Sequence, residues 1–579
     1  MRFDELADYF AKLEATGRRL GAVHLIVELF DRAGSDELPA IVYLLQGQLR
    51  PPYEGIELGL GERLLARALV RAYGLSESKV VQRYRRLGDL GLVAAELAQA
   101  RRGRISVQDV HRALLEIAQS AGPGSVARKT EAFDTLLQRV GSLAAKYLVR
   151  IGQGRLRLGI GDATIMEAAA QGALHDRGKK HVIEHAYNVR TDLGSVVRLA
   201  YAKGERALMH VGPEVGVPIR PALAQRLPSA DAIVTRLGTA RVEPKYDGFR
   251  LQVHRDGARV WVFSRRLENV SAMFPELASA ARRQIRARRA ILEGEAVVYD
   301  RKTGRFLPFQ VTITRKRKHG TAAAAARHPL RLYAFDLLYA NGRDYLPRSL
   351  RERAGALSRL IRAEPDDTIA VTDAIETDRP AELERYFRTM LRRGLEGIVA
   401  KRPDAPYRAG ARGYDWVKLK RAYQSKLRDT VDVVIVGYLA GRGKRAALGI
   451  GSLLGAIYDP EHDRFRTVAK IGSGPSEAEW RALRRQLDHY AASQRPPRVD
   501  SLIIPDVWVE PRVVVEVLAD EVTRSPRHTC GKTGEQPGYA LRFPRMLDGV
   551  RADRAPEDAT TEREVLELHR MQRRGTSSR

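Results

Sequence analysis

Apolar side chains recur at helical spacing through the first third of the chain. Leu64, Leu65, Ala68, Leu69 and Ala72 follow one another at intervals of one, three and four positions, which places them on one face of a helix. Similar spacing continues from the start of the chain to about residue 204. The pattern predicts a domain built entirely from helices.

Glycine and proline mark the expected ends of these helices. Gly74 and Gly91 follow periodic apolar stretches, and we expect each to stop a helix. Residues 122–125 read Gly-Pro-Gly-Ser and predict a break inside the helical region. Residues 212–221 are rich in proline and glycine, so we place the first domain at 1–210.

Beyond residue 211 the pattern changes from helical to alternating. Residues 250–254 and 260–263 flank Asp256-Gly257, a dipeptide that favours a type I′ hairpin turn. Further strand-like runs are 291–299, 331–339, 397–401 and 416–420, and helical stretches lie at 275–288 and 381–393. The second domain, 211–427, is therefore predicted to be α+β.

The third region, 428–568, is expected to consist mainly of short strands. They lie at 431–438, 452–458, 464–471 and 513–518, with one helix from about 477 to 490. Several strands with one helix suit a small β-barrel such as an OB-fold. We expect the basic tail, 569–579, to be disordered. The predicted fold class is thus multidomain, with an all-α domain, an α+β domain and a β-barrel.

Composition adds a polyanionic partner to this picture. The 579 residues include 99 Lys and Arg against 70 Asp and Glu, a formal net charge of +29. Neutralising phosphates releases counterions and gives affinity for any sequence, so nucleic acid is the leading candidate partner. The alternative is a solvated basic surface without a specific partner.

Cysteine and hydropathy limit the remaining classes of protein. Cys530 is the single cysteine, which excludes an intramolecular disulfide framework and a multi-cysteine metal site. No stretch approaches about 18 apolar residues, so we expect no membrane span. The first six residues lack the pattern of a signal peptide. We expect a cytoplasmic, nucleoid-associated protein, or a nuclear one if the source is eukaryotic.

Lys245 is the strongest candidate for chemistry. Residues 243–250 read Glu-Pro-Lys-Tyr-Asp-Gly-Phe-Arg. A lysine among cations, phosphate and metal can lose its proton and become a nucleophilic amine. Alone, the tetrapeptide Lys-x-Asp-Gly also fits an exposed lysine before a turn.

Residues downstream could complete such a site. Attack on a nucleotide α-phosphate needs carboxylates for a divalent metal, cations for the pyrophosphate and an aromatic face for the base. Glu295 and Glu396 are candidate carboxylates, Phe335 is the candidate aromatic, and Lys418 and Lys420 share one face of a strand. Each also has an ordinary structural interpretation: a solvated strand edge, a core aromatic or solvent-facing lysines.

In their order along the chain, these elements resemble the nucleotidyltransferase core of ATP-dependent DNA ligases. In that family the lysine of Lys-x-Asp-Gly becomes adenylylated, which implies Lys245 here. The motif Phe-Ser-Arg is present at residues 263–265. The resemblance implies nucleotide contacts from Glu243, Lys245, Arg250, Arg265, Glu295, Phe335, Arg412, Lys418 and Lys420, and metal contacts from Glu295 and Glu396. Lys401 is a weaker match to the phosphate ligands.

The resemblance covers nearly the whole chain. Residues 156–161 and 186–188 are similar to the family's helical DNA-binding domain, and 540–545, Ala-Leu-Arg-Phe-Pro-Arg, resemble a block of its carboxy-terminal barrel. One departure concerns the closing block, which normally ends in Arg-x-Asp-Lys. This chain has Arg551-Ala-Asp-Arg554, and arginine is a wider, planar donor than lysine.

The resemblance implies an ATP-dependent DNA ligase that seals nicks in double-stranded DNA in replication, repair and recombination. ATP would be the AMP donor, Mg²⁺ the metal and nicked duplex DNA the substrate. A monomer is expected, and a sliding clamp is a further candidate partner. Two alternatives stay open at this point: an RNA ligase or capping-type nucleotidyltransferase, and a catalytically silent DNA-binding paralogue.

Overall fold

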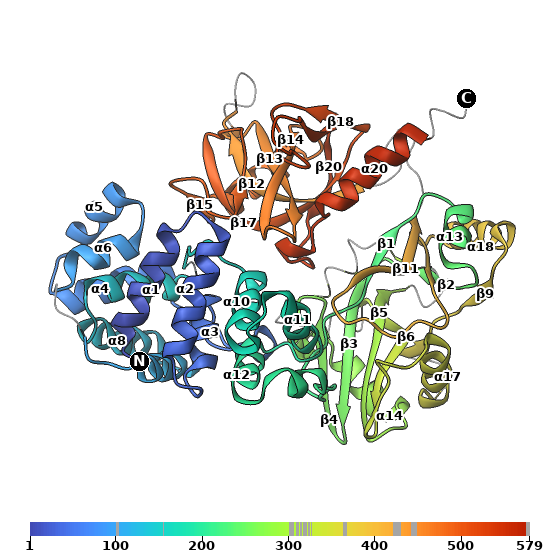
Figure 1. Cartoon of the computed structure of the whole chain (residues 1–579), viewed down its shortest axis with the longest axis horizontal. Coiled ribbons are helices and arrows are strands. Elements are labelled where there is room, and N and C mark those ends of the chain that lie inside the picture. Colours follow the sequence, from blue (N-terminus) through green and yellow to red (C-terminus); the bar gives the residue numbers. More distant parts are fainter. Residues whose placement is uncertain are drawn as a thin grey trace. The chain divides into compact units, whose positions relative to one another are not determined.

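The computed structural model describes most of the chain (Figure 1). The described residues are 1–99, 103–154, 156–299, 306, 307, 312, 315, 321, 325, 327–362, 368–420, 430–441 and 448–574. They form two compact units, one of 1–184, 192–210 and 425–579, the other of 185–191 and 211–424. The domain boundary expected at residue 427 and the last five residues of the tail lie outside the described part. None of the helices within it is both long and apolar enough to cross a membrane.

The amino-terminal region is helical, as predicted. Its α-helices are α1 (Phe3–Ala15), α2 (Arg19–Arg32), α3 (Leu38–Leu45), α4 (Glu62–Tyr73), α5 (Glu77–Leu87), α6 (Leu90–Leu97), α7 (Val107–Gln119), α8 (Ser125–Gln138), α9 (Ser142–Gly152), α10 (Asp162–Leu174), α11 (Lys180–Val189) and α12 (Leu193–Met209). Gly74 ends α4 at a φ of 64°, a left-handed conformation that glycine adopts without strain. The stop expected at Gly91 is wrong: Gly91 is buried in the first turn of α6, and Gly88 ends α5.

The α+β region contains two sheets. Its strands are β1 (Leu223–Arg226), β2 (Ala240–Lys245), β3 (Phe249–Asp256), β4 (Arg259–Ser264), β5 (Arg289–Val298), β6 (Leu330–Ala340), β7 (Arg343–Asp344), β8 (Ile369–Val371), β9 (Ile375–Thr377), β10 (Gly397–Lys401) and β11 (Arg412–Lys420). One sheet has the order β1-β11-β10-β2-β9, and the other has the order β4-β3-β5-β6-β7, with β8 on β6. The helices are α13 (Ala230–Leu237), α14 (Pro275–Gln284), α17 (Leu350–Leu360) and α18 (Pro380–Arg392).

Strand β10 lies between β2 and β11 and sets the register of the site. Gly397 is opposite Lys245 on one side and Lys420 on the other. A Cβ atom at position 397 would overlap the carbonyl oxygen of Leu419, so the two strands approach this closely only because residue 397 is glycine. Residues more than 150 positions apart in sequence thereby meet at the ends of three strands.

The hairpin at Asp256 forms, but with a different turn. Asp256 pairs with Arg259, so the two loop residues are Gly257 and Ala258. Among these, only Gly257 has a positive φ, 59°. A positive φ at the first loop residue alone corresponds to type II′. The expected type I′ turn centred on Asp256 and Gly257 is therefore wrong: the turn lies one residue later, at Gly257 and Ala258, and has a different type.

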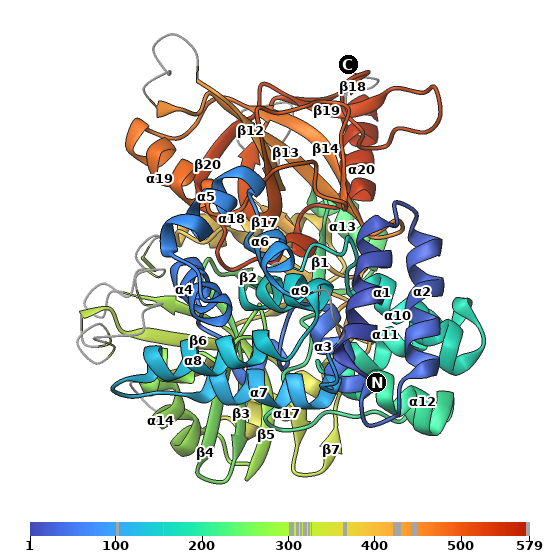
Figure 2. The same ribbon diagram turned by 90° about the vertical axis from the view of Figure 1, so that its left-hand side faces the viewer.

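The carboxy-terminal region is strand-rich (Figure 2). Its strands are β12 (Thr430–Leu439), β13 (Ser452–Asp459), β14 (Arg464–Ile471), β15 (Ala491–Ala492), β16 (Val499–Asp500), β17 (Val507–Leu518), β18 (Glu521–Ser525), β19 (Gly538–Arg542) and β20 (Arg545–Val550). A large sheet has the order β15-β17-β12-β13-β14-β16, with β20 on β17. Val433, Val515 and Trp480 are among the side chains buried in its core. The predicted fold class is confirmed.

Two details of this region differ from expectation. Besides α19 (Glu477–Asp488) it contains a second helix, α20 (Glu562–Arg574). Residues 569–574, expected to be disordered, form the end of this helix. Val565, within α20, is fully buried in the same core as the strands. Burial of Val565 stabilises the packing of α20 on the strands. The basic composition of residues 569–579 does not reveal this contact.

Candidate active site

Lys245 ends β2 with its side chain directed at Glu396. The Lys245 ammonium donates a hydrogen bond to Glu396 Oε2, and Lys420 forms an ion pair with Glu396 Oε1. All three side chains are partly exposed. Burial alone would raise the pKa of Glu396, but Lys245 and Lys420 outweigh it and hold that pKa well below its ordinary value. The carboxylate thus links the candidate nucleophile to a second cation.

Glu295 lies on β5 among the same cations. Burial raises the pKa of the Glu295 carboxyl to about 7, although Lys245, Arg250 and Arg265 act in the opposite direction. Its strand partner on β3 is Arg250. Within the described part of the chain, no hydrogen bond to the Glu295 carboxylate is formed. A partly desolvated carboxylate without a hydrogen-bond donor is suited to bind a cation.

Glu243 and Lys401 form a buried ion pair beside the aromatic rings of Phe335 and Trp416. Lys401 Nζ lies 2.6 Å from Glu243 Oε2. The same nitrogen lies 4.5 Å from the ring centre of Phe335 and 4.2 Å from that of Trp416. Burial lowers the pKa of Lys401, and Glu243 offsets this only in part. Lys401 is thus held in the core by Glu243 and these two rings, and its match to the phosphate ligands stays a prediction.

Phe335 is the more exposed of these two rings. Its ring is half-buried, and its centre lies 6.0 Å from that of Trp416 in an edge-on arrangement. The Arg250 guanidinium lies 5.4 Å from the centres of both rings. A partly open aromatic face beside cations can stack on a nucleobase.

The remaining predicted residues, Lys418, Arg265 and Arg412, are placed by their positions on or next to β4 and β11. Lys418 pairs with Val399 on β10 and lies two positions before Lys420, so both lysines share one face of β11. Arg265 directly follows β4 and acts electrostatically on Glu295. Arg412 begins β11, but the register with β1 shifts between Arg412 and Lys418. This shift breaks the alternation that would otherwise place Arg412 on the same face.

Sequence reasoning missed several residues that shape the site. Trp416 was noted only as the start of a strand, and Tyr407 and Gln252 carried no motif. Glu293 is 1% exposed and binds Arg250 at 2.8 Å. The one available signal was the spacing of Glu293 and Glu295, which places two carboxylates on the same face of β5.

The arginines of the closing block are both engaged within the carboxy-terminal region. Arg551 Nε lies 3.0 Å from Asp553 Oδ1, and Arg554 Nη1 lies 2.6 Å from Asp432 Oδ2. Both guanidinium groups are largely buried. In this structure these cations stabilise the sheet that carries them.

The described residues do not form a metal site from protein side chains alone. They contain no group of three or more histidine, cysteine or acidic side chains that could hold an ion. Mg²⁺ in nucleotide enzymes keeps several waters and binds one or two carboxylates together with substrate phosphates. Glu295 and Glu396 fit this second mode of binding.

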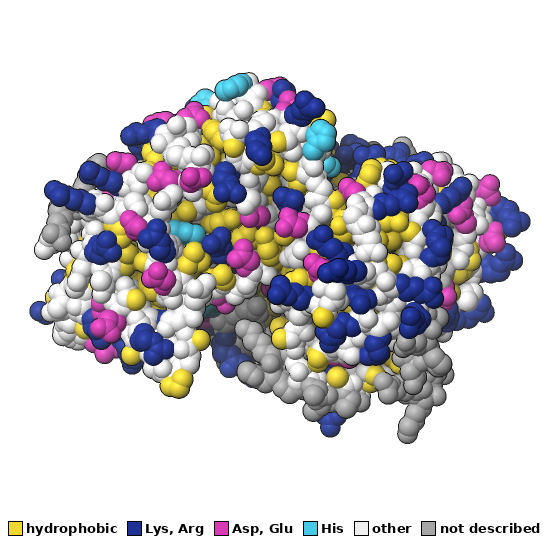
Figure 3. Space-filling view, turned by 90° about the horizontal axis from the view of Figure 1, so that it is seen from below, with side chains coloured by type: hydrophobic (Ala, Val, Ile, Leu, Met, Phe, Trp, Pro, Cys, Tyr) yellow, Lys and Arg dark blue, Asp and Glu magenta, His cyan; other side chains and the backbone are white. Residues whose placement is uncertain are grey.

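Positive charge is spread widely over the surface. Lys and Arg side chains are scattered across the face in Figure 3, with Asp and Glu between them. With the net charge of +29, such a surface favours a long polyanion over a single small anion. Lys245 paired with a carboxylate, the second lysine Lys420 and the half-buried Phe335 ring supply a nucleophile, a cation and a stacking face for a nucleotide.

Comparisons with known proteins identify the family. The model for the DNA ligase N terminus matches residues 2–170, that for the ATP dependent DNA ligase domain matches 221–420, and that for the ATP dependent DNA ligase C terminal region matches 446–554. A probable DNA ligase of Dictyoglomus turgidum is 45% identical over 99% of this chain and 98% of its own length. DNA ligases of Sulfolobus acidocaldarius and Pyrobaculum calidifontis are 39% and 42% identical, over 98% and 99% of this chain and 98% and 99% of their own lengths.

The chain belongs to the ATP-dependent DNA ligases. It is an enzyme that uses ATP as AMP donor, with the Mg²⁺ dependence usual in the family, and acts on DNA. The alternatives, an RNA ligase or capping enzyme and a silent paralogue, are not favoured.

Proposed function

We propose that Lys245 is the residue that accepts AMP from ATP in the first step of ligation. The observation that carries this proposal is the pairing of Lys245 with Glu396, which also binds Lys420, at the meeting point of β2, β10 and β11. Glu396 thus holds the candidate nucleophile and a second fixed cation side by side. A nucleophile and a cation are both needed near a phosphate that is about to be displaced.

The residues around Lys245 divide by the part of ATP that they suit. Glu243 and Phe335, beside the Lys401 pair, would bind the adenine end. Arg250 and Glu295 would lie toward the ribose and α-phosphate. The cations assigned to the phosphates are Arg265, Arg412, Lys418 and Lys420.

The first transfer forms one bond and breaks another. The Lys245 nitrogen attacks the α-phosphorus, an N–P bond forms, and the bond to the bridging oxygen breaks to release pyrophosphate. The ammonium must lose a proton before it can attack. Glu396 accepts a hydrogen bond from this nitrogen and fixes its position, but the low pKa of this carboxyl makes it a weak base, so the proton passes on to solvent. Lys420 then remains as a cation near the departing charge.

Glu295 and Glu396 would hold Mg²⁺, which supplies positive charge to the nucleotide phosphates. The fit rests on the Glu295 carboxylate, which has a raised pKa and receives no hydrogen bond in the described part of the chain. Removing this carboxylate should therefore weaken the response to Mg²⁺ more than the response to ATP alone.

Two further transfers would complete sealing. AMP passes from Lys245 to the 5′-phosphate at a nick, and the 3′-hydroxyl displaces AMP to join the strand. We also propose that the protein acts as a monomer on chromosomal DNA.

Labelling with ATP radioactive at its α-phosphate, in the presence of Mg²⁺, tests the nucleophile. Wild type should become labelled, and Lys245→Ala and Lys245→Arg should not. Lys203→Ala, at an exposed lysine of α12, is the matched control and should label normally. Lys245→Ala should still seal a nick that already carries AMP on its 5′-phosphate, because that step needs no nucleophilic lysine. Full labelling of Lys245→Ala would disprove the assignment.

A further inference from the structure

Residues 218–222 form a strap that side chains of the α+β unit hold by its backbone. Ile219 N donates to Gln252 Oε1 at 2.8 Å, and Gln252 Nε2 donates back to Ile219 O at 2.9 Å. Ala222 N donates to the Tyr407 hydroxyl at 2.9 Å, and Arg250 Nη1 donates to Ala222 O at 2.6 Å. Four backbone groups of the strap are thus bound by three side chains.

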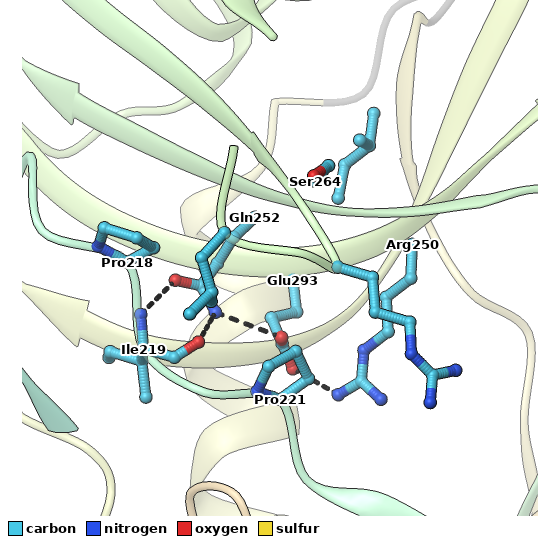
Figure 4. A pocket seen from close by; sticks show the side chains of 10 residues that line it. Pro218, Ile219, Pro221, Arg250, Gln252, Ser264 and Glu293 are labelled. Atoms are coloured by element: carbon cyan, nitrogen blue, oxygen red, sulfur yellow. Dashed lines mark hydrogen bonds and ion pairs between the residues drawn. The ribbon is translucent and has the colours of Figure 1, made fainter. Parts of the chain in front are cut away.

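Glu293 connects these three side chains to one another. Its Oε1 accepts from Gln252 Nε2 at 3.1 Å, and its Oε2 accepts from Arg250 Nη2 at 2.8 Å and from the Tyr407 hydroxyl at 2.7 Å. Figure 4 shows Gln252 between Ile219 and Glu293, with Arg250 on the other side of Glu293. A carboxylate only accepts hydrogen bonds, so three converging donors fix its position.

The Arg250 guanidinium is held at both terminal nitrogens by this network. Its Nε is buried and makes no hydrogen bond in the described part of the chain. A guanidinium carries five donor hydrogens in a rigid fork, so fixing Nη1 and Nη2 sets the direction of the others. The group also lies 5.4 Å from the ring centres of Phe335 and Trp416.

We propose that Gln252 and Tyr407 are positioning residues that act through Glu293 and the strap to orient Arg250 toward the bound nucleotide. This inference rests on the proposed role of Arg250 as a nucleotide contact. Neither Gln252 nor Tyr407 would touch ATP. They hold Arg250 in one conformation before ATP binds, so that binding costs less side-chain conformational entropy.

A buried polar network needs every member satisfied, and a satisfied network fixes one arrangement of its side chains. Here the buried polar side chains converge on Arg250, beside the predicted nucleotide pocket. Tyr407 uses its hydroxyl both as acceptor, from Ala222, and as donor, to Glu293. Removing that one oxygen loosens the strap and the carboxylate together.

A double-mutant cycle on nick sealing at varied ATP concentration tests the inference. Tyr407→Phe should raise the KM for ATP about tenfold with kcat little changed, as expected when a binding interaction common to ground and transition states is weakened. Arg250→Ala should raise the KM further. In the Arg250→Ala background, adding Tyr407→Phe should change the KM by less than about twofold, because the group that it positions is gone.

Tyr386→Phe is the matched control. Tyr386 lies in the same unit, and its buried hydroxyl has no hydrogen-bond partner in the described structure. This variant should leave the KM unchanged. If Tyr407→Phe does not fold, as judged by its melting temperature, Gln252→Met takes its place in the same cycle.

The possible failures are distinct. An unchanged KM for Arg250→Ala would refute its proposed nucleotide role. If Arg250→Ala raises the KM but Tyr407→Phe multiplies it by the same factor with and without Arg250, the positioning role is refuted and the nucleotide role stands.

Discussion

Lys245 ends β2, Glu396 directly precedes the neighbouring strand β10, and the lysine ammonium donates a hydrogen bond to the carboxylate. The same carboxylate pairs with Lys420. Removing it takes away the negative charge that both ammonium groups share, and it also removes the hydrogen-bond acceptor of the nucleophile. Glu396 should therefore be needed for lysine adenylylation.

Glu396→Ala should lower the rate of lysine adenylylation by about a hundredfold or more. Glu396→Gln, which keeps a hydrogen-bond acceptor but no charge, should fall between this variant and wild type. Single-turnover labelling with α-labelled ATP measures both rates. Equal rates for Glu396→Gln and wild type would mean that the charge of Glu396 has no role in this step.

Gly397→Ala should separate β10 from β11. The added methyl overlaps the Leu419 carbonyl oxygen, a backbone atom that cannot yield without moving the strand. We expect a loss of about 1–3 kcal/mol in the free energy of unfolding, together with slower adenylylation, because Glu396 precedes this glycine. Gly413→Ala, on β11, meets no atom within 4 Å and is the control. Urea unfolding compares the two variants, and equal losses would contradict the explanation.

Lys401→Met should be strongly destabilising because it removes the closer of two cations from the buried Glu243 carboxylate and leaves Arg241 Nε at 3.3 Å. Removing one member of a buried pair typically costs about 3–5 kcal/mol. Combining Lys401→Met with Glu243→Gln should recover much of this loss. Arg388→Met breaks an exposed pair with Glu384, 2.9 Å long, and should cost less than about 1 kcal/mol. Chemical denaturation distinguishes these outcomes, and a cost for Lys401→Met no larger than for Arg388→Met would contradict the burial argument.

His254 should make the protein sensitive to acid. Its ring is fully buried, Nδ1 accepts from Gly216 N at 3.0 Å, and burial lowers its pKa to about 3. Below the ordinary histidine pKa the unfolded chain binds a proton that the folded state excludes. This contribution to stability is therefore present near neutral pH and is lost as the pH falls from about 6.5 toward 3.

The raised pKa of Glu295 makes its own contribution to stability increase as the pH falls, which opposes the effect of His254. The test therefore compares the stability of wild type with that of a His254 variant at each pH. His254→Gln keeps a neutral hydrogen-bonding side chain that does not titrate. Between about pH 7.5 and about pH 4.5, wild type should lose roughly 2–3 kcal/mol relative to His254→Gln. Parallel unfolding curves for the two proteins across this range would contradict the prediction.

Binding to nicked DNA should depend steeply on salt. If six or more phosphates are neutralised, affinity should fall about a thousandfold or more between about 50 mM and about 200 mM salt. Lysine adenylylation involves only the phosphates of ATP and should change much less. Fluorescence anisotropy on a nicked duplex measures the first, and labelling measures the second. Nick affinity that is independent of salt would count against a backbone-directed surface.

Local patterns along the chain determined much of what this protein is. The change from helical to alternating periodicity marked the start of the sheets, and the motif around Lys245 identified the nucleophile now proposed. These features depend on neighbouring residues, so they can be read without knowing the fold. Gly91 shows the limit: a glycine in a helical region can end a helix or permit close packing, and here it is buried against α9, where a Cβ would meet Arg150.

Only the tertiary structure decided which side chains meet. The pairing of Lys401 with Glu243, the position of Trp416 behind Phe335 and the connection from Tyr407 through Glu293 to Arg250 join residues far apart in sequence. Such contacts depend on strand order and register, which the hydrogen bonds between strands fix. Burial then decides what a charged side chain binds. A lysine on the surface is hydrated by solvent, whereas a lysine in the core, such as Lys401, needs a carboxylate partner.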